Sequence, residues 1–288
     1  MEVILSYLWS VIVVTLGQLV FLFAPLAILG TILHVLAKAV SSLGDSLLGR
    51  KGYYWTFGWL GTVVHELGHA IFCVIFRHRI TEIKLLTLDT QGTLGYVNHS
   101  YDPDSLYQNI GTFFISIGPI ILGSLVAYLS ARFLLLPEIQ SSLRELTVKG
   151  DSFLSLQAIW ELLKEFSMAA YGFLRSFVEN FDLTDWRLYL FLYIVGSVAS
   201  SQELSSADLE GVWYGLGVII GAVFMLNLLT LWTADMIGYV LSAEIFSFFV
   251  QEIGNPFASV LLVAILIGGM LAVVLTPLAL IKMLFNRR

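Results

Sequence analysis

Charged residues are scarce in this sequence. Only 12% of its 288 residues are Asp, Glu, Lys or Arg, whereas 58% are hydrophobic; soluble globular domains carry about 25% charged residues. So little charge cannot cover the water-facing surface of a soluble domain of this length, which excludes a soluble enzyme and a disordered chain. The sequence therefore predicts an integral membrane protein in contact with the lipid bilayer.

Cysteine and basic residues are also few. The single cysteine, Cys73, excludes an internal disulfide and a cysteine-rich metal site. Acidic residues outnumber basic ones by 21 to 15, which gives a formal net charge of -6. No nucleic-acid partner is expected, because neutralising phosphates requires a surplus of Lys and Arg.

Long stretches without charge locate the membrane spans, since a helix needs about 20 mostly apolar residues to cross the hydrocarbon core. We expect an all-α polytopic membrane protein with about six transmembrane helices in a single domain, 1–288. The expected spans are 3–37, 52–76, 105–131, 188–202, 211–234 and 253–281. The first is too long for a cleavable signal peptide and lacks its basic start.

Two connections between the spans have patterns of their own. Residues 77–105 contain short apolar runs at 83–88 and 93–97, separated by glycine and aspartate, which predicts a small membrane-associated β-hairpin. Residues 137–185 form an extramembrane loop, in which 154–178 has apolar residues at helical spacing between charged ones. That pattern predicts an amphipathic helix on the membrane surface.

The positions of Lys and Arg suggest an orientation. Basic residues follow the second span and the last span, and with six spans these two segments lie on the same side of the membrane. The positive-inside rule assigns that side to the cytoplasm. The residues concerned are Arg77, Arg79, Lys84, Lys282, Arg287 and Arg288. We therefore expect a multi-pass protein whose active site lies nearer the cytoplasmic side.

Ionisable residues within a span are costly and indicate function. His65, Glu66 and His69 form a His-Glu-x-x-His pattern in the second span. Positions i and i+4 share one helix face about 6 Å apart, so both imidazoles can bind one zinc ion while Glu66 acts as general base on the metal-bound water. A solvated face, the usual structural explanation in a soluble helix, is not available inside a membrane. The pattern predicts one catalytic Zn2+ per chain.

A hydrolytic zinc centre needs a third protein ligand. Asp208 is the strongest candidate, because it lies at the junction of the fourth and fifth spans, on the side where the helix carrying His69 ends. Asp208 has an alternative, structural role in the first turn of a helix capped by Ser205 or Ser206, and it can fill both roles at once. Further candidates that remain open are Glu210, Asp235 and Glu244.

Three other residues fit structural roles better. Cys73 lies eight residues from His65, about 12 Å along the helix axis, which is too far to share the ion; we expect it in the core. His34 is expected to be a buried histidine with one hydrogen bond. His78, between two arginines, is expected at the membrane interface.

These motifs resemble the site-2 protease family of intramembrane zinc metallopeptidases, and more closely its compact bacterial members without a PDZ domain. The resemblance covers roughly residues 55–235. Its motifs are His65 to His69 in an apolar helix, the glycine-containing hairpin 92–97, Gly118-Pro119 in the third span, and Asp208 before Gly211.

The sequence departs from the family pattern in three places. Asp208 and Gly211 are separated by two residues where the family has an Asp-Gly pair. No Asn follows Gly118-Pro119 at the customary place, and no Asn-Pro pair precedes Asp208.

The resemblance implies zinc held by His65, His69 and Asp208, with Glu66 as base. It also implies a membrane-protein substrate, whose transmembrane helix must partly unwind, and a location in the bacterial cytoplasmic membrane.

The hairpin suggests how such a substrate would bind. Extended substrate backbone could pair with the hairpin edge around Gly92 and Gly95. Asn98 or His99, which follow, could donate a hydrogen bond to the oxyanion. Their structural alternative, a polar turn at the membrane surface, is the favoured interpretation.

Other functions remain open. A membrane metalloprotease whose third ligand is a glutamate would use Glu244. A di-iron oxygenase is disfavoured, since only two of the five histidines are paired. A non-catalytic membrane binding protein or chaperone could retain the metal, although the intact Glu66 argues against it. Two G-x-x-x-G pairs, Gly211 with Gly215 and Gly217 with Gly221, fit close helix packing either within the chain or between copies, so the oligomeric state stays open.

Overall fold

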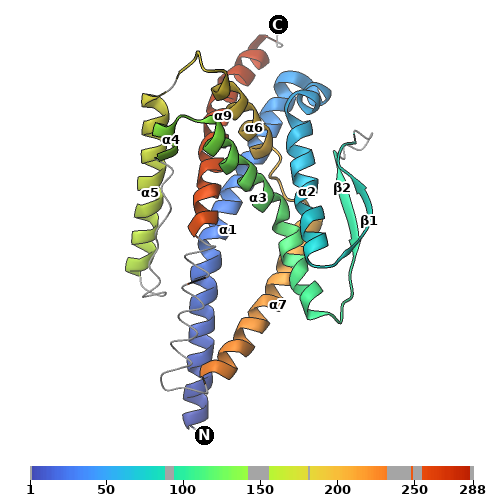
Figure 1. Ribbon diagram of the computed structural model, residues 1–288, viewed down its shortest axis with the longest axis vertical. Coiled ribbons are helices and arrows are strands. Elements are labelled where there is room, and N and C mark those ends of the chain that lie inside the picture. Colours follow the sequence, from blue (N-terminus) through green and yellow to red (C-terminus); the bar gives the residue numbers. More distant parts are fainter. Residues whose placement is uncertain are drawn as a thin grey trace.

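The computed structural model describes residues 2–87, 94–141, 156–180, 182–231, 248 and 255–285. They form an all-α polytopic membrane protein with a small β-hairpin, as the sequence predicts (Figure 1). The helices are α1 (Glu2–Tyr53), α2 (Trp59–Ile75), α3 (Leu106–Leu134), α4 (Pro137–Ser141), α5 (Leu156–Glu179), α6 (Trp186–Ala199), α7 (Ser206–Thr230) and α9 (Asn255–Phe285), with a π-helical turn η1 (Tyr54–Gly58) between α1 and α2.

Each of the six expected spans forms a helix, but α6 is short. Its 14 residues extend about 21 Å, less than the hydrocarbon core of about 30 Å. In Figure 1, α6 and α7 follow one another in the same direction, so together they are long enough to form one passage. Five stretches of the described residues are long and apolar enough to cross a membrane: Glu2–Val20, Leu26–Ile75, Leu106–Leu134, Ser206–Thr230 and Leu261–Phe285.

This shared passage changes the expected orientation. Lys282 near the end of α9 donates hydrogen bonds to the carbonyls of Ser46 and Leu47, so α9 ends beside the turn where α2 begins. Arg77 and Arg79 lie at the other end of α2. The prediction that the two basic segments share a side is therefore wrong, because α6 does not cross on its own. Residues 287 and 288 lie outside the described part of the chain.

Gly49 marks the end of regular helix in α1. Its backbone angles, φ 71° and ψ 155°, are not helical and lie in a region that glycine adopts readily. Carbonyls just before this kink therefore lack the helical N–H donors of the residues that follow. The ammonium of Lys282 donates to two of these carbonyls instead, at 2.7 Å from Ser46 O and 2.9 Å from Leu47 O.

Glycines bring α2, α3 and α7 into close contact. A Cβ on Gly68 of α2 would lie 2.6 Å from the carbonyl carbon of Gly118 in α3, so only hydrogen fits between the two backbones. Gly211 and Gly215 of α7 pack in the same way on α3, against Ser116 and Phe113 respectively. A Cβ on either member of the second G-x-x-x-G pair, 217 and 221, would meet none of the described residues within 4 Å.

The expected hairpin is present, with shifted strands. β1 (Arg79–Lys84) pairs antiparallel with β2 (Tyr96–Ser100), with an irregularity in register between Ile80 and Glu82. The first strand begins early because Arg77 adopts a positive φ of 59° and the N–H of His78 returns to the carbonyl of Cys73. The chain therefore reverses at once after α2, and the hairpin lies beside that helix (Figure 1).

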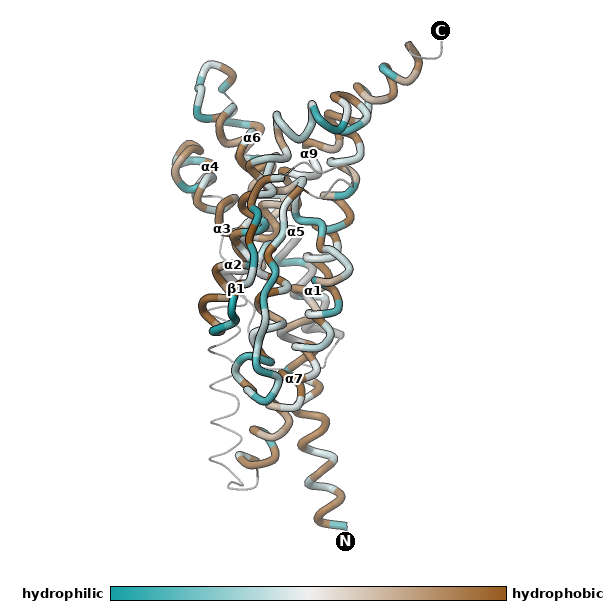
Figure 2. The backbone as a smooth tube through the Cα atoms, turned by 90° about the vertical axis from the view of Figure 1, so that its right-hand side faces the viewer, coloured by the Kyte–Doolittle hydropathy of each residue, from teal (hydrophilic) through white to brown (hydrophobic). Residues whose placement is uncertain are grey.

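The stretch expected to form an amphipathic helix is α5. It stands alongside the bundle rather than across its end (Figure 1), with Phe173 and Phe177 buried in the core. The remainder of the loop, 142–155 and 181, lies outside the described residues. Figure 2 shows hydrophobic residues along the N-terminal part of α1 and hydrophilic residues along the hairpin.

Candidate metal centre

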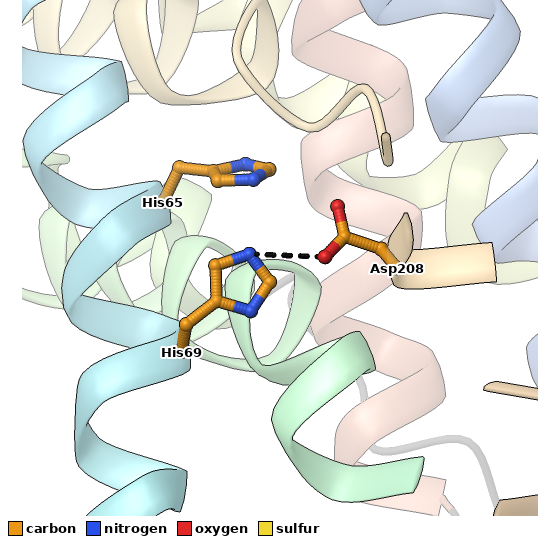
Figure 3. A group of neighbouring side chains, drawn as sticks. All are labelled: His65, His69 and Asp208. Atoms are coloured by element: carbon orange, nitrogen blue, oxygen red, sulfur yellow. Dashed lines mark ion pairs between the residues drawn. The ribbon is translucent and has the colours of Figure 1, made fainter. Parts of the chain in front are cut away.

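His65 and His69 lie one turn apart on α2 and point toward Asp208 at the start of α7 (Figure 3). Their ligand atoms all lie within 4.8 Å of one another, and His69 Nε2 is 3.3 Å from Asp208 Oδ1. Two ligand atoms of a tetrahedral zinc ion, each about 2.0 Å from it, are also about 3.3 Å apart. Within the described residues, this is the one cluster of three groups that could hold a metal ion.

Backbone carbonyls orient both imidazoles. His65 Nδ1 lies 2.7 Å from the carbonyl oxygen of Ser201, and His69 Nδ1 lies 2.8 Å from that of Ile115. A carbonyl oxygen can only accept, so each Nδ1 carries the hydrogen and each neutral ring keeps a lone pair on Nε2. This is the arrangement in metal centres, where a ligating histidine donates its other N–H to a nearby acceptor.

Asp208 uses its two carboxylate oxygens differently. Oδ2 accepts hydrogen bonds from the N–H and the hydroxyl of Ser205, both at 2.7 Å, and the N–H of Asp208 donates back to Ser205 Oγ in a capping box. Oδ1 faces His69. The helix-cap role is therefore confirmed, and it leaves one oxygen for a metal. A lone pair on nitrogen and a carboxylate oxygen at 3.3 Å repel each other unless a cation or proton lies between them.

Glu66 is buried beside the ligands, with 7% of its surface exposed, and its charge interacts with that of Asp208. The chain entering β2 packs directly on it: a Cβ on Gly95 would lie 2.7 Å from Glu66 Cγ and 3.1 Å from Thr62 Cγ2. Glycine at 95 therefore allows the hairpin to approach the candidate base. Gly92, the other glycine expected to bind substrate, lies outside the described residues.

Strand alternation separates Asn98 from His99. Side chains of the same parity share one face of a strand, so His99 lies on the face of Gly95, which contacts α2. Asn98 is exposed on the opposite face. Of the two residues proposed to bind the oxyanion, only His99 is placed on the side of α2.

His99 is paired with His78, which the sequence did not indicate. His78 is buried rather than interfacial; its Nε2 lies 2.8 Å from the carbonyl oxygen of Gln108, and its Nδ1 lies 3.0 Å from His99 Nδ1. Burial lowers the pKa of His78, and burial together with the charges of His78 and His69 lowers the pKa of His99 to about 4. Both rings are therefore neutral at pH 7.

These contacts determine where the hydrogens lie. His78 must donate from Nε2 to a carbonyl, so its Nδ1 accepts from the Nδ1–H of His99. The neutral ring of His99 then has a lone pair on Nε2. Such a ring accepts hydrogen bonds there and cannot donate one to an oxyanion, contrary to the catalytic role considered for His99. The favoured interpretation, a polar turn, is also wrong, because Asn98 and His99 lie within β2.

The remaining candidates have structural places. Cys73 is fully buried, as expected. His34 accepts the expected hydrogen bond, from the N–H of Leu204 at 3.1 Å, but it is only partly buried rather than buried. Glu210 is exposed and does not belong to the cluster. Asp235 and Glu244 lie outside the described residues.

Comparisons of the chain with protein-family models, curated proteins and solved structures found no match. The resemblance to site-2 proteases therefore stays a prediction, and the case for function depends on the residues of the cluster.

Proposed function

We propose that this chain is an intramembrane zinc metallopeptidase, similar to site-2 proteases, which hydrolyses peptide bonds of membrane-protein substrates in a bacterial cytoplasmic membrane. The observation that carries the proposal is the pair of carbonyl-oriented imidazoles, His65 and His69, whose ligand atoms lie within 4.8 Å of each other and of a carboxylate oxygen of Asp208. Two nitrogens and one oxygen suit zinc, and three protein ligands leave the fourth position open for catalysis.

The chain's own residues supply the remaining chemistry. When bound, zinc acts as a Lewis acid and lowers the pKa of a coordinated water to about 7. Glu66, adjacent to the first ligand, accepts a proton from the attacking water and delivers it to the nitrogen of the leaving amine. Its burial under Gly95 keeps that proton transfer away from bulk water.

The hairpin offers a place for the substrate. A substrate helix has its backbone groups bonded internally, so it must unwind locally before a peptide bond can reach the metal. Unwound backbone requires new partners in a membrane, and an edge of the β1–β2 hairpin can supply them by strand addition. Gly95 places this hairpin against Glu66, which supports cleavage of backbone held along it.

Metal analysis combined with a cleavage assay tests the proposal. Purified full-length protein in detergent should contain about one zinc per chain, and His65→Ala and Asp208→Ala should lose it. Glu66→Gln should keep the zinc and lose about 100- to 10,000-fold of the cleavage rate on a membrane-anchored reporter, the range for loss of a general base. Glu210→Gln removes a nearby exposed carboxylate and should change neither. Undiminished cleavage by Glu66→Gln would overturn the mechanism.

The same experiment separates the alternatives. A glutamate third ligand, such as Glu244, would leave Asp208→Ala with its zinc. A non-catalytic binding protein would hold zinc in the wild type, and no substrate would be cleaved by wild type or variant.

A further inference from the structure

Pro119 lies inside α3, in contact with the helix that carries the two histidines. A residue in a helix interior donates its N–H to the carbonyl four positions earlier, which for position 119 is the carbonyl of Ile115. Proline has no N–H. The Ile115 carbonyl therefore lacks its usual helical donor while α3 continues from Leu106 to Leu134.

The released carbonyl is the one that His69 uses. Its oxygen lies 2.8 Å from His69 Nδ1, and Ile115 and His69 are both buried. The preceding residue makes this contact sterically feasible: a Cβ on Gly68, next to His69, would lie 2.6 Å from both the carbonyl carbon of Gly118 and the nitrogen of Pro119. Glycine at 118 lets the backbones meet, and proline at 119 leaves an acceptor there.

We propose that Pro119 is a positioning residue for the metal ligand His69, an inference that rests on the metal site proposed above. By withholding an N–H, Pro119 reserves the Ile115 carbonyl for His69 Nδ1. That hydrogen bond fixes the tautomer with the hydrogen on Nδ1 and keeps the lone pair of Nε2 directed toward Asp208 Oδ1.

His65 is served by a comparable acceptor. Its partner is the carbonyl of Ser201, just beyond Ser200, the C-cap of α6. Carbonyls at a helix C-terminus have no helical donor. Each imidazole is therefore oriented by an acceptor that an interrupted helix leaves free, at Pro119 in one case and at a helix end in the other.

The test restores the missing donor. Pro119→Ala places an N–H opposite the Ile115 carbonyl, where it competes with His69. The dissociation constant of the metal should rise about tenfold, the lower end of the range for losing the partner of a ligating histidine. Pro119→Ser adds a hydroxyl that can also bond to the carbonyl four residues earlier, so its loss of affinity should be at least as large.

Stability distinguishes positioning from simple packing. Replacing an interior proline by alanine restores a helical hydrogen bond, so the melting temperature of the metal-free Pro119→Ala protein should stay equal or rise while its affinity falls. A proline needed only for packing would lower both together. Pro277→Ala makes the same change inside α9, outside the cluster, and should leave metal affinity unchanged.

The measurement is a titration of metal-free, full-length protein in detergent with Co2+, followed by absorbance, and competition with Zn2+. Wild-type affinity in Pro119→Ala, or an equal loss in Pro277→Ala, would overturn the role of Pro119 while leaving the metal site intact. A wild-type protein that binds neither ion would overturn the metal site itself, and this inference with it.

Discussion

A single hydrogen bond decides the chemistry that His99 can perform. Because its Nδ1–H donates to His78, its Nε2 presents a lone pair. A lone pair accepts a hydrogen bond, and the backbone donors of a peptide substrate are its N–H groups. These carry the same partial charge before and during the reaction, unlike the carbonyl oxygen that becomes the oxyanion. In the proposed peptidase, His99 would thus be suited to holding substrate backbone rather than to stabilising a developing negative charge.

We predict that His99→Phe raises KM about fivefold and leaves kcat nearly unchanged. The expected factor corresponds to the loss of one hydrogen bond worth about 1 kcal/mol in both ground and transition states. Steady-state kinetics on a membrane-anchored peptide measure both constants. Asn98→Ala, on the exposed face of β2, is the control and should change neither. A catalytic rate lowered by about 100-fold or more, typical of a lost oxyanion donor, would contradict the prediction.

Among single residues, the sequence predicted the side chains of the candidate metal site but not the backbone carbonyls that orient them. His65, Glu66 and His69 follow from helical spacing, and Asp208 from its place at a span junction. The carbonyls of Ile115 and Ser201 have no residue type to mark them, although a proline four residues after Ile115 is a usable signal. His78 was placed at the interface because arginines flank it, whereas the positive φ of Arg77 turns the chain inward.

Helix packing in this protein depends on which glycines meet a neighbour. Spacing predicted two close-packing pairs on α7, yet Gly211 and Gly215 contact α3, while a Cβ at 217 or 221 would meet none of the residues that the structure describes. A periodic pattern shows which residues share a helix face, but not where along the helix the neighbour crosses. That crossing is set by the partner, here the small residues of α3 beside α2 and α7.

We predict that Gly68→Ala lowers the free energy of unfolding by about 1–3 kcal/mol, the usual cost of overpacking. The new Cβ would meet the backbone of Gly118, which cannot rotate away, and the separated helices would lengthen the His69 to Ile115 hydrogen bond. Denaturation in detergent measures the stability. Gly217→Ala is the matched control: nothing lies within 4 Å, and alanine favours helix by about 1 kcal/mol. Equal stability of the two variants would contradict the packing described for α2 and α3.

From the directions of its described helices, we expect the molecule to cross the membrane an odd number of times. α1, α2 and α3 alternate in direction, α6 and α7 share one passage, and α9 runs parallel to α1, so the two termini lie at opposite ends (Figure 1). The sequence located every one of these helices. Charge-free length alone did not show that α6, a helix of 14 residues, is followed in the same direction by α7.

We predict that the C-terminus lies in the cytoplasm and the N-terminus outside. Six of the described basic residues belong to elements that end or begin on the side of the bundle where α1 turns into α2, against three beside the hairpin, and basic residues favour the cytoplasmic side. They are Arg50, Lys51, Arg132, Arg175, Arg187 and Lys282 at the first end, and Arg77, Arg79 and Lys84 at the second.

Protease protection of terminal epitope tags in spheroplasts measures this arrangement. An added protease should remove an N-terminal tag and spare a C-terminal one. Tags on the same side would contradict the odd number of passages, whereas exchanged sides would contradict the orientation alone.

The two oxygens of the Asp208 carboxylate have different partners, and this affects which ions the proposed site can accept. With Oδ2 held by the N–H and hydroxyl of Ser205, Asp208 can coordinate through Oδ1 alone and cannot chelate an ion with both oxygens. Calcium requires six to eight oxygen ligands, and magnesium requires octahedral geometry. The proposed site, with two imidazoles and one monodentate carboxylate, meets neither requirement, so under this proposal Ser205, the N-cap of α7, also favours small, nitrogen-preferring ions such as zinc over the abundant hard cations.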